Sequence, residues 1–358
     1  MDFLKNFNKE VEKMEGVSGS SQPPRYWFST GNYVLNKIIS GSFFNGLPQG
    51  RLLGLAGPAG AGKSFVLGNI IMNAQKEGAF CLVIDSENAL DDSFMTGIGV
   101  DINNNYMYKS ITTIPQLTQV VSAFVKGYKN EYGTDENAPR IVIGMDSLDM
   151  LMTETELDQY EKGVTKGDQG QRNKQLKKVL RTFVQDLKGT NISMVVTSQV
   201  YRNQDVLNGE GLWIISDAVR YSLSQIVLLT KLKLKDTGSS EVKGIRMKCE
   251  GYKTRFTKPF QTVTIEVPYE SGMDKFSGLL DVAIALGIVE KAGSRYRLAG
   301  EEKSWYSKEL PEYADKILAK AENNSQFLKI VELTDLEEDN ETETKAETKS
   351  RRGKKVSG

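Results

Sequence analysis

The chain has 358 residues, with 46 lysines and arginines against 46 aspartates and glutamates, two cysteines and no histidine. This length suffices for one large domain with appendages or for two modest domains. Without histidine the chain cannot be a Ser-His-Asp or Cys-His hydrolase, and it cannot bind zinc or haem through imidazole. Cys81 and Cys249 show no metal-binding spacing, so we expect two buried thiols in a reducing compartment such as the cytoplasm.

The sequence predicts no membrane partner. No run approaches the roughly 18 apolar residues of a membrane-spanning helix, and the acidic residues within positions 1–16 are unlike those of a signal peptide. The net charge of zero predicts no global attraction to nucleic acid or to a membrane surface. That inference concerns the sum of the charges only, and cations placed locally can still bind nucleic acid.

Residues 2–14 are predicted to form a short amphipathic helix. Its apolar side chains share one helical face: Phe3, Leu4, Phe7, Val11 and Met14. A run rich in Ser, Gly and Pro follows at 16–24 and predicts a flexible tether. The helix either folds back on its own domain or docks on a neighbouring copy of the chain. In the second alternative Phe3 and Phe7 are interface residues.

Short apolar runs alternate with helical patterns between residues 26 and 267. The runs are rich in aliphatic residues and end in Gly, Asp or polar turns: 52–56, 80–84, 141–145, 192–197 and 226–229. Residues 64–76 repeat their apolar side chains at helical spacing. Buried strands that alternate with helices predict an α/β fold, with a mostly parallel sheet covered on both faces.

The remaining segments predict additions to this core. Residues 245–250 and 262–267 predict an antiparallel extension of the sheet, and residues 276–329 are predicted to be helical, with a break at Gly293 and Ser294. The last residues are rich in Glu, Asp, Thr and Lys and cannot bury enough apolar surface to fold. The expected units are an N-terminal oligomerisation helix with a tether, an α/β core, a small C-terminal domain and a disordered charged tail: 1–25, 26–270, 271–331 and 332–358.

The strongest motif is a phosphate loop, a complete G-x-x-x-x-G-K-[ST] pattern between a predicted strand and a predicted helix. The residues of the expected nucleotide site are Gly57, Pro58, Ala59, Gly60, Ala61, Gly62, Lys63, Ser64 and the adjacent Phe65. Glycines let backbone N–H groups surround phosphate oxygens, and the helix N-terminus adds a favourable dipole. We expect Lys63 to reach the β- and γ-phosphates and Ser64 to ligate Mg²⁺. An ordinary Gly-rich turn is the alternative, which both flanks disfavour.

Carboxylates follow two neighbouring predicted strands. Asp146 ends the strand at 141–145 and is expected to orient the Mg²⁺ shell. Asp85 and Glu87 follow the strand at 80–84, where the carboxyl ends of parallel strands face the ligand crevice. One of these two acids would orient or deprotonate the attacking water. Spacing alone does not favour Glu87 over Asp85, and a solvated loop acid or a helix N-cap is the alternative for both.

The order of these and further motifs resembles the RecA-type recombinase family. The matching segments span most of residues 26–300 and lie at 28–31, 46–51, 57–64, 87–91, 99–101, 146–147, 195–199, 253–260 and 278–293. Several motifs in the right order are more specific than the phosphate loop alone. In its length and in its aromatic residues at 26–28 and 43–44, the chain resembles the phage UvsX-like branch of this family.

The resemblance implies an ATP-dependent recombinase that forms a helical filament on single-stranded DNA and pairs it with a homologous duplex. ATP and Mg²⁺ are the implied cofactors, and a single-stranded DNA-binding protein and a loading factor are the implied partners. For a phage protein the implied location is the host cytoplasm. A ring helicase or motor on the same core is one alternative, which the early position of Glu87 and the short N-terminal helix disfavour. A non-catalytic regulatory paralogue is another, although it normally loses the lysine or the catalytic acid.

The resemblance also implies roles for residues around the nucleotide. Glu87 falls at the position of the family's catalytic glutamate, which polarises water. Gln199 falls where the γ-phosphate is sensed and its state is passed to the following loop. Asp91 and Phe94 fall where the family contacts adenine.

Four residues are expected at the contact between subunits. Lys253 and Arg255 fall where a neighbouring subunit contributes cations across the ATP, which would make hydrolysis depend on assembly. Arg220 and Tyr221 fall where the family couples DNA and ATP across the interface. The alternatives are a basic hairpin exposed to water for the first pair, and a surface arginine beside a core tyrosine for the second.

The family's two DNA loops correspond to residues 156–168 and 200–213. Mobile loops with glycines, cations and aromatic residues suit contact with a DNA backbone and its unstacked bases. The expected contacts of the first loop and the helix after it are Tyr160, Lys162, Lys166 and Arg172, with Lys174 beside them. The expected contacts of the second loop are Tyr201, Arg202, Asn203, Gly209 and Gly211. Both loops also contain acids and scarcely match the bacterial pattern.

Overall fold

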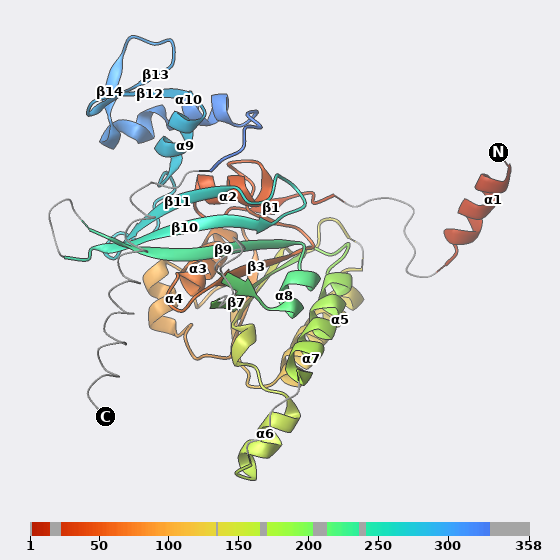
Figure 1. Cartoon of the computed structure of the whole chain (residues 1–358). Helices are drawn as coiled ribbons and strands as arrows, with labels where there is room; N and C mark the ends of the chain where they lie inside the picture. The colour runs from red at the N-terminus through yellow and green to blue at the C-terminus, as the bar shows by residue number, and fades with distance from the viewer. Residues whose placement is uncertain are drawn as a thin grey trace, which may run out of the picture.

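The computed structural model describes residues 2–14, 23–133, 135–164, 170–202, 213–235 and 241–329 (Figure 1). The described residues form a nine-stranded central sheet in the order β11-β10-β9-β3-β7-β6-β4-β5, and β8 pairs with β7. The six strands from β9 to β5 of this order are parallel to one another. Their bounds are Leu52–Gly57 (β3), Phe80–Asp85 (β4), Tyr106–Ser110 (β5), Ile141–Asp146 (β6), Ile192–Arg202 (β7) and Gln225–Leu234 (β9).

Antiparallel strands extend this parallel sheet, as expected from the sequence. The added strands are β8 (Trp213–Ile215), β10 (Gly244–Lys253) and β11 (Thr262–Pro268). A separate two-stranded sheet joins β1 (Trp27–Phe28) to β2 (Leu47–Pro48). The predicted α/β fold with a mostly parallel sheet is therefore confirmed.

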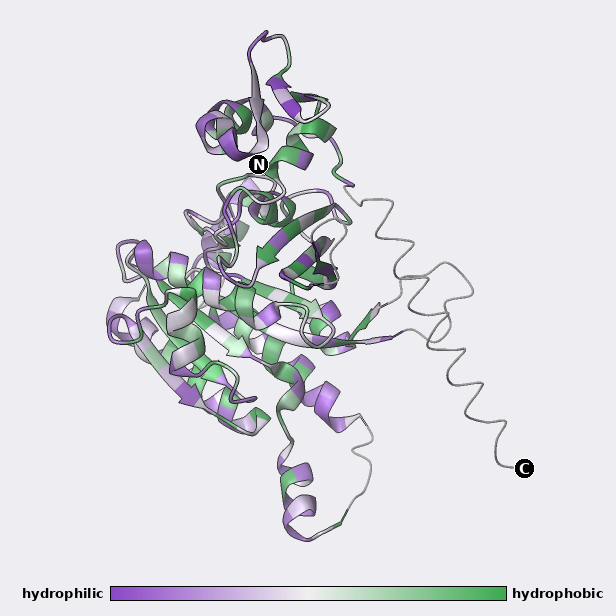
Figure 2. Cartoon of the chain, turned by 90° about the vertical axis from the view of Figure 1, so that its left-hand side faces the viewer, coloured by the Kyte–Doolittle hydropathy of each residue, from purple (hydrophilic) through white to green (hydrophobic). Residues whose placement is uncertain are grey.

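Helices cover both faces of the sheet, because alternate side chains of a strand point to opposite faces. Within β3, Leu53 and Leu55 belong to the apolar cluster on the face of α2 and α3, whereas Leu52 and Ala56 belong to the cluster on the face of α5 and α7. Figure 2 shows the hydrophobic residues concentrated in the strands. The covering helices are α2 (Tyr33–Ser40), α3 (Lys63–Lys76), α4 (Asp92–Ile98), α5 (Ile114–Tyr132), α7 (Gln171–Asp186) and α8 (Asp217–Ser222).

The C-terminal segment differs from its predicted structure. The expectation of helix throughout residues 276–329 is wrong, because a three-stranded antiparallel sheet lies in its middle. Gly293 has a φ of 60° and forms, with Ser294, the two-residue turn between the paired residues Ala292 and Arg295. The elements are α9 (Leu279–Ala285), β12 (Val289–Ala292), β13 (Arg295–Leu298), β14 (Ser304–Tyr306) and α10 (Leu310–Ala321).

This segment packs on the core through α2. Its buried residues, among them Trp305, belong to the same apolar cluster as those of α2 and β11. Glu322 accepts hydrogen bonds from Lys37 Nζ at its backbone carbonyl (3.1 Å) and from the Phe43 N–H at Oε2 (2.9 Å). The division of the chain into 26–270 and 271–331 stays a prediction, and the tail at 332–358 lies outside the described residues.

The predicted N-terminal helix is present as α1 (Asp2–Val11), and none of its residues is buried. Phe3, Leu4 and Phe7 are 77%, 62% and 51% exposed, so an apolar face of α1 meets solvent in the single chain. Among the helices of the described ranges, none is both long and apolar enough to cross a bilayer.

Candidate active site and nucleic-acid interface

The carboxyl ends of four neighbouring strands bring the predicted catalytic residues to one edge of the sheet. Gly57, the first residue of the phosphate loop, lies opposite Gln199 in the pairing of β3 with β7. Asp85 lies opposite Asp146 in the pairing of β4 with β6. Adjacent strands are about 4.8 Å apart, so segments that are distant in the sequence converge here.

The phosphate loop joins β3 to α3 and packs closely on β9. A Cβ on Gly57 would overlap the backbone carbonyl oxygen of Leu229, so no larger residue fits there without moving the loop. Gly60 and Gly62 have φ values of 70° and 92°, the left-handed region that glycine adopts at little cost. Gly62 directly precedes α3, which begins at Lys63 and leaves its first N–H groups facing the loop.

Lys63 lies folded over this loop. Its side chain is largely buried, and Nζ donates hydrogen bonds to the carbonyl oxygens of Gly57 (2.9 Å) and Pro58 (3.0 Å). Burial lowers the pKa of Lys63, while the nearby carboxylates of Asp146 and Glu87 oppose that shift. An ammonium group that is partly desolvated and close to the loop backbone gains favourable energy from a polyphosphate.

Asp146 and Ser64 fit the requirements of a Mg²⁺ ion. Asp146 is 1% exposed; one of its oxygens accepts a short hydrogen bond from the Thr197 hydroxyl, and Oδ2 has no hydrogen-bond partner of normal geometry in the described chain. Burial raises the pKa of Asp146, and the Ser64 and Thr197 hydroxyls oppose that shift. No cluster of three Asp, Glu or Cys side chains in the described ranges forms a metal site alone. A Mg²⁺ ion here would complete its shell with phosphate oxygens and water.

The structure separates Asp85 from Glu87, which spacing in the sequence could not do. The fully buried Asp85 carboxylate accepts hydrogen bonds from the N–H groups of Glu87 (2.8 Å) and Leu90 (2.9 Å) and from the Tyr108 hydroxyl (3.1 Å). Glu87 is exposed, and its carboxylate accepts a short hydrogen bond from the Ser147 hydroxyl, next to Asp146. Asp85 therefore holds the loop, and Glu87 carries the accessible carboxylate.

Gln199 is held by Asp149, an aspartate that was not expected at the site from the sequence. Its backbone N–H donates to Asp149 Oδ2 at 2.5 Å, and the side chain of Gln199 is half-buried at the end of the parallel part of β7. Asp149 lies in the 3₁₀ helix η1 (Leu148–Met150) after β6, and burial raises its pKa. Its only sequence signal was its position three residues after Asp146.

Asp91 and Phe94 begin helix α4. The Asp91 carboxylate accepts a hydrogen bond from the Phe94 N–H (2.8 Å) and caps the helix, while the Phe94 ring packs partly on the core. Phe65, in the first turn of α3, also packs on the core. The cap uses one carboxylate oxygen of Asp91 and leaves the other available to a ligand. The adenine contacts of Asp91 and Phe94 therefore stay a prediction.

Lys253 and Arg255 lie far from the phosphate loop of their own chain. Lys253 pairs with Ile226 near the start of β9, and Arg255 lies close to Arg51, which precedes β3. The length of β3 places Arg51 about 20 Å from Gly57. These cations therefore do not join the nucleotide site within one chain. Their predicted action on a neighbouring subunit stays open.

Arg220 and Tyr221 end α8 beside these cations. Lys253 Nζ donates to the Arg220 carbonyl oxygen (2.6 Å), and the Arg220 guanidinium pairs with Asp217 (2.9 Å) and lies 4.8 Å from the Tyr221 ring centroid. Tyr221 is 59% exposed, so the alternative of a core tyrosine is wrong. An exposed aromatic ring beside a cation suits a contact surface, and the interface role stays a prediction.

The first predicted DNA loop is partly helical. Thr153 and Glu156 form a capping box that starts α6 (Glu154–Glu161), so Tyr160 lies on a helix and is 79% exposed. Lys162 ends this helix and pairs with Asp158 (2.6 Å). The expectation of a mobile loop from residue 156 is therefore wrong, because this capping box starts a helix there. Lys166 lies outside the described residues.

The second predicted DNA loop begins within a strand. Strand β7 continues to Arg202 and pairs with β8, Tyr201 opposite Ile214 and Arg202 opposite Trp213. Tyr201 is 54% exposed, so its ring reaches solvent on this hairpin. The structure does not describe the segment that contains Asn203, Gly209 and Gly211.

Arg172 has a structural partner in the described chain. Its guanidinium donates hydrogen bonds to the carbonyl oxygens of Leu151 (2.9 Å) and Leu148 (3.1 Å), and a short one to that of Asp149. These bonds join the start of α7 to η1. They favour a role for Arg172 in holding Asp149, rather than the predicted phosphate contact.

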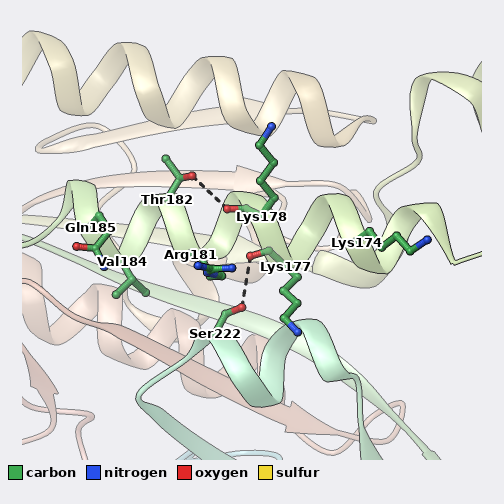
Figure 3. A pocket seen from close by; sticks show the side chains of 8 residues that line it. All are labelled: Lys174, Lys177, Lys178, Arg181, Thr182, Val184, Gln185 and Ser222. Carbon is green, nitrogen blue, oxygen red and sulfur yellow. Dashed lines mark hydrogen bonds between the residues drawn. The ribbon is translucent and has the colours of Figure 1, made fainter.

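A basic groove lies between α7 and α8, and of its residues only Lys174 was expected from the sequence. The groove has a volume of about 670 Å³, and Figure 3 shows basic side chains of α7 beside Ser222 of α8. Its lining, which defines the α7 groove, consists of Lys174, Lys177, Lys178, Arg181, Thr182, Val184, Gln185 and Ser222. The cations recur every three or four residues and so share one side of the helix, a signal that the sequence did contain. Among the described residues, none of the four has an acidic partner within ion-pair distance.

The comparison with known protein families agrees with this geometry. Residues 5–274, about three quarters of the chain, match the RecA N-terminal domain. The chain belongs to the RecA family. Family members are recombination and repair proteins that bind ATP and DNA. The matched range includes the phosphate loop, Glu87, Asp146 and Gln199.

Curated relatives cover most of this RecA-family chain and most of their own length. Protein RecA of Mycoplasma mycoides subsp. mycoides is 27% identical over 305 residues, which are 84% of each chain. Protein RecA of Thermus aquaticus is 27% identical over 337 residues, 88% of this chain and 92% of the relative. That of Rickettsia canadensis is 25% identical over 322 residues, 87% and 88% of the two chains. These matches do not test the UvsX-like phage branch, which stays a prediction.

Proposed function

We propose that this RecA-family protein is a DNA-dependent ATPase that forms a helical filament on single-stranded DNA and exchanges its strand with a homologous duplex. One observation carries this proposal: the phosphate loop, Glu87 and Asp146 converge at one sheet edge, and Arg172 joins the start of the basic helix α7 to η1 at that edge. Residues 26–270 would supply the ATPase core and residues 271–331 a small C-terminal domain.

The residues of the site suit ATP hydrolysis. Backbone N–H groups of the phosphate loop and Lys63 would bind the phosphates, and Asp91 and Phe94 would contact the base. Ser64 and Asp146 would hold Mg²⁺, which neutralises phosphate charge. Glu87 would orient or deprotonate the attacking water, because its carboxylate is exposed beside Ser147.

The surface beside this site suits single-stranded DNA. The four cations of the α7 groove would bind phosphates, and the exposed Tyr201 and Tyr160 would stack on bases. Lys162 and Arg202 lie on the same two segments and would add cations. The proposal extends to the predicted contacts beyond the described residues, which are Lys166, Asn203, Gly209 and Gly211.

One strand joins the two activities. Strand β7 carries Gln199 opposite Gly57 and continues to Tyr201 and Arg202, so one strand would link the proposed γ-phosphate sensor to the proposed DNA contacts. Lys253 and Arg255 would act on the ATP of a neighbouring subunit, because they lie at the opposite edge of their own sheet. Hydrolysis would therefore require assembly, and ADP release would loosen the filament.

The experiment is an ATPase assay with and without single-stranded DNA, combined with a joint-molecule assay on homologous and heterologous DNA. We expect DNA-stimulated turnover and joint molecules with the homologous duplex only. The variant Lys63→Ala should lose at least about a hundredfold in turnover, because it removes the main phosphate cation of the chain's own loop.

Two results would contradict the proposal. Normal turnover by Lys63→Ala would refute the assignment of the site. DNA-stimulated hydrolysis without joint molecules would refute the recombinase function, and electron microscopy would then distinguish a ring-shaped motor from a filament.

A further inference from the structure

Strand β9 lies against the phosphate loop along several residues. Gly57 packs against the Leu229 carbonyl, and a Cβ on Gly62 would lie 3.1 Å from Met247 Sδ, on the neighbouring strand β10. Leu229 and Lys231 are two residues apart on β9, so their side chains point to the same face. Lys231 Nζ occupies the space that a Cβ on Gly60 would need, and its Cε lies 3.6 Å from that position. The ammonium group therefore lies against the middle of the loop.

Lys231 is a second cation at the phosphate loop. It is exposed, and among the described residues it has no acidic partner within ion-pair distance. Burial lowers the pKa of Lys63, and Lys231 adds to this shift because the two ammonium groups repel each other. The two ammonium groups repel each other, and an anion bound between them would remove this repulsion by attracting both. The backbone N–H groups of the loop would bind the same anion.

We propose that Lys231 binds the polyphosphate of the nucleotide in its own phosphate loop, as a cation supplied by β9 of the same chain. The inference rests on the proposed ATP site and adds to it a residue outside the G-x-x-x-x-G-K-[ST] motif. Lys231 differs from Lys253 and Arg255, which lie at the opposite edge of the sheet, far from the phosphate loop of their own chain. The glycine at position 60 leaves room for the lysine to approach the loop backbone.

The test is the binding of a fluorescent ATP analogue with Mg²⁺ to the full chain, in the absence of DNA. We expect Lys231→Ala to weaken binding about tenfold, since it removes a charge-assisted hydrogen bond to phosphate. Lys231→Arg should restore most of the affinity. The matched control is Lys233→Ala, which removes another exposed lysine from the same face of β9 and should bind as the unchanged chain does. Because Lys231 is exposed, all variants should unfold at a similar temperature.

Two outcomes would overturn the proposal. If Lys231→Ala binds nucleotide as Lys233→Ala does, Lys231 does not contact the polyphosphate. If its nucleotide affinity is normal and its affinity for single-stranded DNA falls in a separate anisotropy measurement, Lys231 binds DNA phosphates instead. The nucleotide-binding measurement needs no DNA and no strand exchange, so a failure of the recombinase function in the joint-molecule assay stays distinguishable from a failure of this inference.

Discussion

Two carboxylates separated by a single residue have opposite environments in this site. Asp85 is fully buried and accepts three hydrogen bonds, whereas Glu87 is exposed beside Ser147. A general base must be accessible to water, whereas a carboxylate that organises a turn must accept hydrogen bonds from the surrounding chain. At the scale of single residues, burial therefore favours Glu87 over Asp85 for the proposed catalytic role, a choice that sequence spacing left undecided.

Replacing Glu87 by Gln should slow ATP turnover by about a hundredfold, since positioned acid–base groups contribute on this order. Nucleotide binding should persist, because the loop and Lys63 are unchanged, and ATP-bound filaments should accumulate. Steady-state hydrolysis and nucleotide binding would be measured side by side. Rapid turnover by this variant would contradict the role of Glu87.

The control at the neighbouring acid has a different expected result. Asp85→Asn removes acceptor capacity from a buried carboxylate that binds three donors, which should lower the free energy of unfolding by about 1–3 kcal/mol. Thermal unfolding should therefore distinguish the two variants, with Glu87→Gln close to the unchanged chain. Equal stability of the two variants would contradict the assigned role of Asp85.

At the scale of elements, α7 combines a buried face with a cationic one. Leu176, Leu180 and Phe183 pack in the core, while the cations of the α7 groove face solvent. The start of this helix is joined by Arg172 to η1, whose Asp149 holds the backbone of Gln199. A continuous set of contacts thus links the groove to the nucleotide site.

The pair of substitutions Lys177→Ala and Arg181→Ala should weaken the binding of single-stranded DNA. The plot of the logarithm of the binding constant against the logarithm of the salt concentration should also become less steep. Its slope should change by about 0.7 for each DNA phosphate that the variant no longer neutralises. Fluorescence anisotropy with a labelled oligonucleotide at several salt concentrations measures both quantities. The control is Lys188→Ala, an exposed lysine beyond the end of α7. An unchanged slope in the double variant would rule out the groove as a DNA site.

At the scale of the whole molecule, several features are incomplete in a single chain. The apolar face of α1 is exposed, and Lys253 and Arg255 lie at the edge opposite the phosphate loop. Both features suit an assembly in which each chain contributes residues to its neighbour. A net charge of zero is compatible with DNA binding, because cations can be gathered locally, as they are on α7.

Deleting residues 1–16 should weaken self-assembly and leave the core folded, since no residue of α1 is buried. The pair Phe3→Ser and Phe7→Ser should act in the same direction, and Lys5→Ala on the same helix serves as the control. Light scattering and electron microscopy of filaments measure assembly, and circular dichroism checks the fold. Unchanged filaments in both variants would indicate that α1 has no interface role.

The sequence by itself determined the features that depend on local patterns. The alternation of apolar runs with helical repeats predicted the α/β sheet, and the motif from Gly57 to Ser64 predicted the loop between β3 and α3. Local turn chemistry was also present where the prediction erred: Gly293 turns a hairpin within the segment expected to be helical, and Thr153 with Glu156 starts a helix within the expected loop.

Only the tertiary structure decided which side chains meet at the site. Lys231 is 168 positions from Lys63 in the sequence, yet the pairing of β9 with β3 brings it to the phosphate loop. The burial that separates Asp85 from Glu87 also depends on Tyr108, from the next strand. Strand order and register set these contacts, because the apolar core determines the pairing of strands across long stretches of sequence.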